Sequence, residues 1–264
     1  MNNILKWQKV KNYNEMSRIA AKLIFNTIIK NLKIKNKINI GLATGNTMLK
    51  VYRNLADMFN NSGTNLSGMA TYNLDEYVDN EGNNIYINHN LSYALYMKNN
   101  FFSLLNPNLE FKFSNIFFPD AKNPEKYDTD IADAGNLDFQ LLGIGFNGHI
   151  AFNEPLPADS ISIEKFKALP SRIVELNELT IKTNAKLTAG NNLLKVPQKA
   201  VTMGMATILK AEKILLLACF PEQTIPLQMI KKNMISPEIP ASCLLQHKNS
   251  IIIYTSDKIT LTEK

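Results

Sequence analysis

Short apolar runs alternate along this chain with segments of helical periodicity, and this alternation constrains the fold more than any other feature. The runs that predict strands are Ile38–Leu42, Met69–Leu74, Leu137–Ile144, Ile214–Ala218 and Ile251–Tyr254. The segments that predict helices are Glu15–Leu32, Leu49–Phe59, Leu91–Leu105 and Thr207–Glu212. Apolar strands that alternate with helices are typical of a parallel sheet covered by helices. The sequence therefore predicts an α/β fold in three layers, a mostly parallel sheet with helices on both faces, built as a single domain over residues 1–264.

The composition excludes several classes of protein. The chain is 45% hydrophobic and 20% charged, which is ordinary for a soluble domain. Its longest apolar run, Ile214–Phe220, is far shorter than the roughly 20 residues that cross a bilayer, and the N-terminus lacks the apolar core of a secretory signal. Cys219 and Cys243 lie in apolar segments, which favours buried free thiols. We therefore expect a cytoplasmic protein with no membrane partner.

The net charge of +6 fits either a nucleic-acid partner or a small anionic substrate. The lysines are scattered, with no arginine-rich stripe and no interleaved aromatic residues, so we expect no nucleic-acid partner. The three histidines, His89, His149 and His247, share no metal-ligand spacing with cysteines or carboxylates. The sequence predicts no metal site.

Ligands of parallel α/β sheets bind outside the carboxyl ends of the strands, and three polar segments fall there. The first is the run of Thr44, Gly45, Asn46 and Thr47, between a predicted strand and a predicted helix. Backbone N–H groups and hydroxyls at a helix N-terminus form an anion site. The spacing matches neither a P-loop nor a dinucleotide fingerprint, and capping of the helix by Thr44 or Thr47 explains the run equally well.

The second segment contains two adjacent carboxylates, Asp75 and Glu76, at the end of a predicted strand. Neighbouring side chains of a strand point in different directions, so the two are expected to have different tasks. One would face the cleft, while the other caps a helix or pairs with a base. A solvated acidic turn is the alternative interpretation.

The third segment, Gly145–Pro155, follows the most apolar strand and contains His149. Asn147 and Glu154 flank this histidine, and each can hydrogen-bond a ring nitrogen. A histidine that a polar partner orients is the usual arrangement for acid–base catalysis, whereas a lone histidine is more often structural. We favour the functional interpretation for His149.

These motifs carry a resemblance to a known family. The stretch GxNGHIAFNEP, with LDEYV upstream and ATGNT before it, closely resembles the glucosamine-6-phosphate deaminase family, the glucosamine/galactosamine-6-phosphate isomerases. The resemblance covers nearly the whole chain and continues through Val196–Pro197, Thr202–Leu209 and Ile239–His247. It implies a modified Rossmann-like fold and the conversion of an aminosugar 6-phosphate to a ketose 6-phosphate and ammonia. It implies no cofactor and no metal, and it allows a homo-oligomer.

The resemblance also assigns catalytic roles. Asp75 matches the carboxylate that carries a proton between C2 and C1 of the opened sugar. His149 matches the acid–base of ring opening, and Glu154 matches its carboxylate partner. Asn147 stands where some members have Asp, and we expect activity to survive this change because the carbonyl oxygen still accepts a hydrogen bond. Glu76 is expected to have a supporting role.

The phosphate contacts of the family are only partly present. The family loop usually has Gly and then Thr-Pro where this chain has Asn46–Met48. Lys186 matches a second phosphate contact, which is Arg or Lys in the family. A third, a Lys after the strand Ile214–Ala218, is missing here. Either Lys195, Lys199 or another base compensates, or phosphate binding is weak.

Four functions remain open at this point. Glucosamine-6-phosphate is the favoured substrate, and the galactosamine epimer is a rival that leads to tagatose-6-phosphate. A 6-phosphogluconolactonase-like hydrolase shares the fold but has no need of a carboxylate for deprotonation. A non-catalytic sugar-phosphate sensor would fit the missing phosphate contact. The presence of Asp75, His149 and Glu154 together favours the enzyme.

Overall fold

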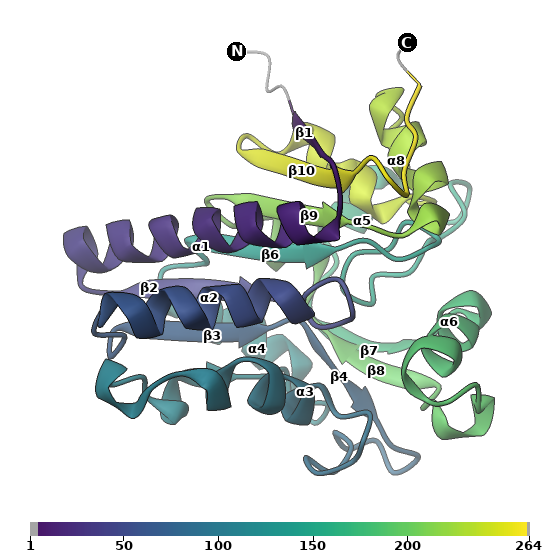
Figure 1. Ribbon diagram of the computed structural model, residues 1–264. Helices are drawn as coiled ribbons and strands as arrows, with labels where there is room; N and C mark the ends of the chain where they lie inside the picture. Colours follow the sequence, from purple (N-terminus) through teal and green to yellow (C-terminus); the bar gives the residue numbers. More distant parts are fainter. Residues whose placement is uncertain (1–4, 263–264) are drawn as a thin grey trace.

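A seven-stranded parallel sheet forms the centre of the molecule in the computed structural model, which describes residues 5–262 (Figure 1). The strand order is β1-β10-β9-β6-β2-β3-β5, and every neighbouring pair is parallel. The strands are β1 (Lys6–Val10), β2 (Ile38–Leu42), β3 (Met69–Asn73), β5 (Ile116–Phe117), β6 (Phe139–Gly143), β9 (Ile214–Ala218) and β10 (Ser250–Thr255). All five predicted strands are confirmed: β2 and β9 have the predicted ends, and the ends of β3, β6 and β10 differ by at most two residues. The edge strands β1 and β5 are additions.

Helices cover both faces of this sheet. Helices α1 (Tyr13–Lys35) and α2 (Leu49–Ser62) lie side by side in front of it in Figure 1, and α4 (Pro124–Asp133) lies behind. The other helices are α3 (Tyr93–Asn100), α5 (Ile163–Lys167), α6 (Glu178–Thr188), α7 (Met205–Leu209) and α8 (Thr224–Lys231). The three-layer α/β prediction is therefore confirmed.

The ends of α1 show why this helix is longer than predicted. The Asn12 side chain accepts a hydrogen bond from the backbone N–H of Glu15, which caps the N-terminus. Asn36 adopts the left-handed conformation at the other end, and its N–H donates to the carbonyl of Leu32. With these caps the helix extends two residues further at its N-terminus and three further at its C-terminus than the predicted span of Glu15–Leu32.

A second, smaller sheet was not predicted. Strands β4 (Asp75–Val78), β8 (Lys199–Thr202) and β7 (Arg172–Glu175) pair antiparallel in the order β4-β8-β7. Only Leu74 separates β4 from β3, so the chain passes directly from one sheet to the other. Helix α6 lies against this sheet (Figure 1), and their shared apolar cluster includes Tyr77, Phe152 and Ala185. Helix α6 is therefore held over the carboxyl ends of the main strands.

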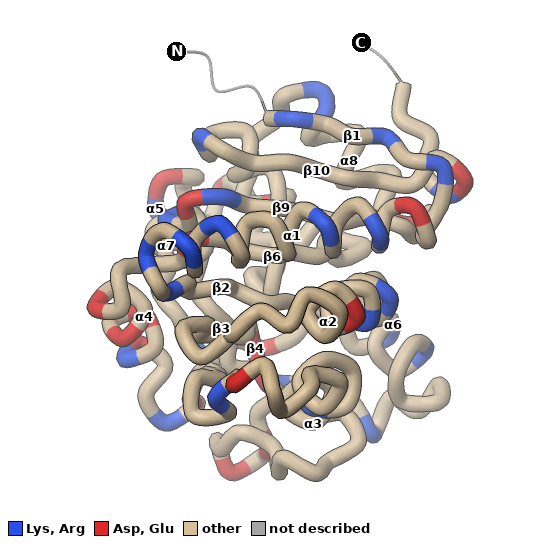
Figure 2. Tube along the Cα trace, turned by 60° about the vertical axis from the view of Figure 1, so that its left-hand side comes forward, with Lys and Arg blue, Asp and Glu red and all other residues tan. Residues whose placement is uncertain are grey.

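The surface and the cysteines agree with the composition. Lys and Arg are spread over many elements (Figure 2). Cys243 is buried, Cys219 is partly buried, and both are free thiols. Within residues 5–262, no helix has the length and apolar character needed to cross a bilayer.

Candidate active site

One pocket of about 160 Å³ lies at the carboxyl ends of β2, β3 and β6. The three polar segments that were predicted from the sequence all line it, through Gly45, Asp75 and His149 among others. Helix α6 contributes a fourth wall, with Thr180, Thr183, Asn184 and Leu187. The predicted convergence of the three loops is thus what the structure shows, at the place expected for a ligand of a parallel sheet.

The two adjacent carboxylates have different environments, as their places in the strand predict. Asp75 lines the pocket and is only 6% exposed, and its carboxylate has no hydrogen-bond partner within residues 5–262. Glu76 points the other way, where it accepts hydrogen bonds from the Ser92 hydroxyl and from the N–H groups of Tyr77, Tyr93 and Ala94. Glu76 therefore caps the N-terminus of α3 and is not a solvated acidic residue.

The pKa values of Asp75 and Glu76 reflect these different environments. Burial, with a smaller contribution from the Glu76 carboxylate, raises the pKa of Asp75 well above its ordinary value. Burial also raises the pKa of Glu76, but its four hydrogen bonds oppose that effect. A desolvated carboxylate without donors is a stronger base than an ordinary one, which suits proton abstraction from carbon.

His149 and Glu154 form a hydrogen-bonded pair. Their atoms Nδ1 and Oε2 are 3.3 Å apart, and the side chains are 16% and 10% exposed, respectively. Asn147 does not reach the ring, contrary to one of the two predicted contacts. Its amide donates to Glu154 Oε2 at 2.7 Å, and its Oδ1 accepts from the His149 backbone N–H. Asn147 thus orients the carboxylate that orients the histidine.

The ionisation of Glu154 follows from these neighbours. Burial alone raises the pKa of Glu154, but a hydrogen bond and the charge of His149 outweigh it, with further hydrogen bonds from Thr180 and Asn147. The net effect is a pKa below the ordinary value. An ionised Glu154 holds a proton on Nδ1 of the ring, which leaves Nε2 for exchange with a ligand.

Hydrogen bonds within the loop and to neighbouring segments fix the loop that carries His149 and Glu154. Gly145 N–H donates to the carbonyl of His149 at 2.9 Å, and a Cβ at position 145 would lie 2.4 Å from the histidine ring. The buried Asn153 donates to the carbonyl of Met203 and accepts from the Arg172 guanidinium. Glycine at position 145 is needed because the imidazole stacks directly on the backbone.

The Thr44–Thr47 loop joins β2 to α2 and lines the same pocket. Gly45 adopts a φ of +104°, and its carbonyl accepts from the N–H of Met48. The capping explanation for the two threonines is wrong, because the N-terminus of α2 has no side-chain cap. Thr47 Oγ1 instead lies 3.6 Å from Cys219 Sγ. The loop thus places hydroxyl and backbone groups, next to the positive end of the α2 dipole, at the pocket.

No lysine or arginine is among the described residues that line this pocket. Lys186, on α6, is exposed and is not one of the lining residues, so the structure does not bring it to the loop. Lys195 lines a different groove, and Lys199 faces Glu175 at 3.6 Å. The two lysines considered as substitutes for the missing contact are therefore not in the pocket either.

Several lining residues were not singled out from the sequence. Tyr93 of α3 and Thr180 and Asn184 of α6 reach the pocket from elements outside the three loops. Asn184 also donates to the Tyr77 hydroxyl at 2.7 Å. The only sequence signal for α6 was the match of Lys186 to a family position, and Lys186 lies on this helix but is not among the residues that line the pocket.

His247 lies outside the pocket and has a structural environment. His247 is buried, with Nε2 2.8 Å from the Ala211 carbonyl and Nδ1 2.8 Å from the Ser250 hydroxyl, so it is structural. Within residues 5–262, no group of three or more His, Cys, Asp or Glu side chains is arranged to hold a metal ion.

The chain is similar to curated proteins of one family over nearly its whole length. No family model matches the chain. The glucosamine-6-phosphate deaminase of Clostridium acetobutylicum is 39% identical over 255 residues, which cover 94% of this chain and 96% of the relative. The enzyme of the same name from Clostridium perfringens strain 13 is 36% identical over 257 residues, 95% and 97% of the two chains.

The chain belongs to the glucosamine-6-phosphate deaminase family.

The solved structures agree with this membership. A monomeric glucosamine-6-phosphate deaminase superposes with a TM-score of 0.84 at 31% identity, over 96% of this chain and 98% of the other. A 6-phosphogluconolactonase of Thermotoga maritima gives a TM-score of 0.66 at 19% identity, over 95% and 99% of the chains. The likeness to the lactonase concerns the fold alone, so that among the open functions the deaminase family is the one that the comparisons support.

Proposed function

We propose that the protein is an aminosugar-6-phosphate deaminase that converts glucosamine-6-phosphate and water to fructose-6-phosphate and ammonia. The observation that carries the proposal is the convergence of Asp75, His149 and Glu154 on one pocket. A sugar-phosphate sensor has no need of a base held dry beside an oriented acid–base pair. Relatives at 36–39% identity that bear this name support the same conclusion.

In this proposal the ring-opening step belongs to His149. Its Nε2 takes the proton of the O1 hydroxyl and returns a proton to the ring oxygen, which breaks the C1–O5 bond and leaves a free aldehyde. Glu154 keeps the Nδ1 proton in place and stabilises the imidazolium that forms during the transfer. Asn147 fixes the carboxylate through its 2.7 Å hydrogen bond, a task that requires no negative charge at position 147.

Asp75 then carries the isomerisation. Its carboxylate takes the C2 proton to give an enolamine and delivers it to C1, and water hydrolyses the resulting C2 imine to the ketone with release of ammonia. One base serves both carbons because they are adjacent. Positioned acid–base catalysis contributes about 10²–10⁴-fold to such steps. No step requires a metal ion or an organic cofactor.

The 6-phosphate is proposed to bind at the loop of Thr44, Gly45, Asn46 and Thr47. Hydroxyls, backbone N–H groups and the helix dipole supply the attraction there, since the described lining residues include no cation. Free thiols fit a reducing cytoplasm, which we propose as the location. A homo-oligomer stays a prediction, and light scattering of the purified protein measures it.

The test is an ammonia-release assay with four substrates: glucosamine-6-phosphate, galactosamine-6-phosphate and the two free amino sugars. We expect the highest kcat/KM for glucosamine-6-phosphate, and an activity of Asp75→Asn that is lower by about 10²–10⁴-fold. Preference for the galactosamine epimer would reassign the substrate. Hydrolysis of 6-phosphogluconolactone without ammonia release from any sugar would overturn the proposal.

A further inference from the structure

Helix α6 makes a contact with the His149–Glu154 pair that the roles assigned above do not include. Thr180 is 4% exposed, and its Oγ1 lies 3.4 Å from His149 Nδ1. The same hydroxyl acts on Glu154 as a hydrogen-bond donor that lowers the pKa of that carboxyl. The same nitrogen that faces Glu154 Oε2 thus has a second oxygen beside it, and that oxygen comes from a different element of the fold.

The N-terminus of α6 reaches the same carboxylate. Asn177 is the N-cap of the helix, and its side chain accepts from the N–H of Leu179. Its own backbone N–H points to Glu154 Oε1 at 3.4 Å. The positive end of the helix dipole therefore faces an ionised carboxylate, which is the favourable orientation.

A second anchor fixes how the helix sits. One turn beyond Thr180, the Asn184 amide donates to the Tyr77 hydroxyl of β4 at 2.7 Å. Ala185 is buried in the apolar cluster that includes Tyr77 and Phe152. Helix α6 is thus attached to the small sheet and to the histidine loop at once, and it cannot lift from one without disturbing the other.

From these contacts we infer that Thr180 is a positioning residue, through which α6 holds His149 and Glu154 in the geometry for ring opening. The inference rests on the proposed deaminase function. Thr180 donates its hydroxyl proton to Glu154, so its oxygen accepts from the Nδ1–H of His149. A carboxylate and a hydroxyl that both accept at Nδ1 fix one tautomer, with Nε2 directed to the pocket.

Two substitutions of Thr180 distinguish the positioning role of its hydroxyl from a packing role of its side chain. Valine has nearly the shape of threonine but has no hydroxyl, so Thr180→Val removes the hydrogen bonds and keeps the contact area. Serine keeps the hydroxyl and loses a methyl group. The titratable groups that share the pocket are Asp75, Tyr93 and His149, with Glu154 behind the histidine. Of these, the pair that Thr180 touches is His149 and Glu154.

The experiment measures steady-state ammonia release between pH 5 and pH 9 for the wild type, Thr180→Val and Thr180→Ser. Loss of a hydrogen bond to a charged group predicts a kcat about tenfold lower in Thr180→Val, with KM changed less than about twofold. The acidic limb of the pH profile, which the raised pKa of Asp75 sets, should stay in place, because the contact of Thr180 is with the His149–Glu154 pair. Thr180→Ser should restore both values.

Thr188→Val is the matched control. Thr188 lies on the same helix, is exposed, and its hydroxyl donates to the Asn184 carbonyl. It does not line the pocket, so its removal should leave kcat, KM and the pH profile at wild-type values. A loss in Thr188→Val equal to that in Thr180→Val would assign the effect to the stability of the helix and overturn the inference.

A readout without catalysis separates this inference from the proposed function. Nitrogen-15 shifts of the histidine rings report the tautomer, and His149→Gln identifies the His149 signals. We expect a single Nδ1–H tautomer in the wild type and in Thr180→Ser, and a mixture in Thr180→Val. An unchanged tautomer together with unchanged kcat overturns the inference even if the wild type deaminates the sugar. Absence of deamination in the wild type would refute the proposed function, while the ring shifts still test the role of Thr180.

Discussion

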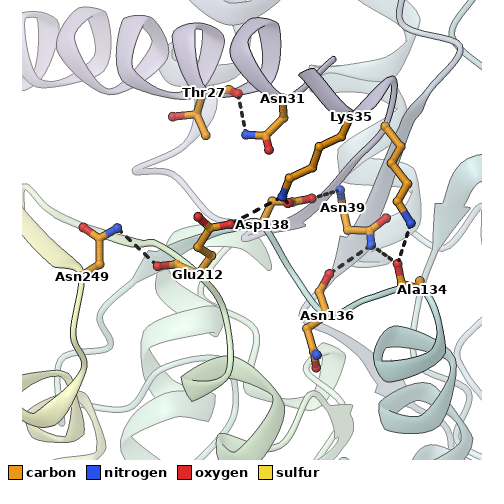
Figure 3. Close-up of polar contacts among 10 residues, drawn as sticks. Thr27, Asn31, Lys35, Asn39, Ala134, Asn136, Asp138, Glu212 and Asn249 are labelled. Atoms are coloured by element: carbon orange, nitrogen blue, oxygen red, sulfur yellow. Dashed lines mark hydrogen bonds and ion pairs between the residues drawn. The ribbon is translucent and has the colours of Figure 1, made fainter. Parts of the chain in front are cut away.

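The two ends of the parallel sheet use the same kinds of polar residue in opposite ways. At the amino end, Figure 3 shows Asp138 between Lys35 and Asn39, with Lys35 Nζ at 2.8 Å from Oδ1 and the Asn39 N–H at 2.8 Å from Oδ2. The Asn39 amide donates in turn to the carbonyls of Ala134 and Asn136. Both carboxylate oxygens of Asp138 thus have a donor, and the cluster fastens α1, β2 and the start of β6 to one another.

At the carboxyl end of the sheet, Asp75 and His149 have polar atoms without a hydrogen-bond partner among the described residues. Asp75 is as buried as Asn39 but has no hydrogen-bond partner among the described residues, and burial raises its pKa. His149 has its Nδ1 engaged, while its Nε2 has no hydrogen-bond partner among residues 5–262. The comparison teaches that burial alone does not identify a site. Unpaired buried atoms alone do not identify one either, because Thr71 Oγ1 and Gln140 Oε1 have no partner among the described residues and do not line the pocket. The site is marked by titratable groups with incomplete hydrogen bonding that face a cavity.

The largest expected effect is the loss of deamination activity when Asp75, at the carboxyl end of the sheet, is replaced. Asp75→Asn should lower deamination by about 10²–10⁴-fold, because a neutral amide cannot accept the C2 proton. The melting temperature should be unchanged or higher. Ammonia release and thermal unfolding, measured on the same preparation, check both halves, and activity within tenfold of the wild type would remove Asp75 from proton transfer.

The pH dependence of the same group has a definite sign. A raised pKa means that the folded protein binds this proton more tightly than the unfolded chain does, so the stabilisation is present at low pH. It is lost as the pH rises through the folded-state pKa of Asp75. Catalysis has the opposite dependence, because the base must be ionised: kcat/KM should rise with pH through a midpoint above the ordinary carboxyl value of about 3.9.

A second change at the carboxyl end tests geometry without altering charge. In Gly145→Ala the new Cβ would lie 2.4 Å from the Cε1 and Nε2 atoms of His149, so the ring must move off the loop. We expect kcat to fall about a hundredfold, as for other misplaced acid–base groups. Gly143→Ala is the comparison variant, because its Cβ would meet only the end of Met48 at 3.6 Å. Equal losses in the two variants would contradict the stacking argument.

The sequence predicted the main sheet and three of the four walls of the pocket. Long apolar strands and a Gly-bounded histidine loop are local signals, and they hold for β2, β6 and β9. The small sheet was missed because β4, β7 and β8 have only four residues each and contain charged side chains. Helix α6 was missed because it buries only Thr180 and Ala185, too few for a helical pattern. The role proposed for Thr180 depends on a contact between segments that are distant in the sequence, and a local sequence pattern does not predict such a contact.

At the amino end the expected effect is on stability and not on activity. Asp138→Ala leaves the Asn39 N–H without its acceptor and should reduce the free energy of unfolding by about 1–3 kcal/mol. A change of this size lowers the melting temperature by about 2–4 °C per kcal/mol in a chain of this length. Asp138→Asn keeps an acceptor and loses only the pairing with the 45% exposed Lys35, so its cost should be below about 1 kcal/mol. A fall in kcat at constant folded fraction would show that the two ends are coupled.

The smallest expected effect is that of Lys186→Ala on KM, and it tests whether the pocket at the carboxyl end binds phosphate without a cation. If the pocket holds the 6-phosphate without a lysine, Lys186→Ala should change KM for glucosamine-6-phosphate by less than about twofold, because the Lys186 side chain is exposed and lies outside the pocket. Lys182→Ala is the matched control on the same helix, where the ammonium already pairs with Glu178 at 2.6 Å.

The family resemblance implies a different result for Lys186→Ala. A direct contact between Lys186 and the phosphate, worth about 1.5–3 kcal/mol, would raise KM roughly 10–100-fold with little change in kcat. Running both variants with glucosamine-6-phosphate and with free glucosamine decides between these outcomes. A large rise in KM that is confined to Lys186→Ala and to the phosphorylated sugar would mean that Lys186 turns into the pocket when the substrate binds, and that the carboxyl end gains its cation only in the complex.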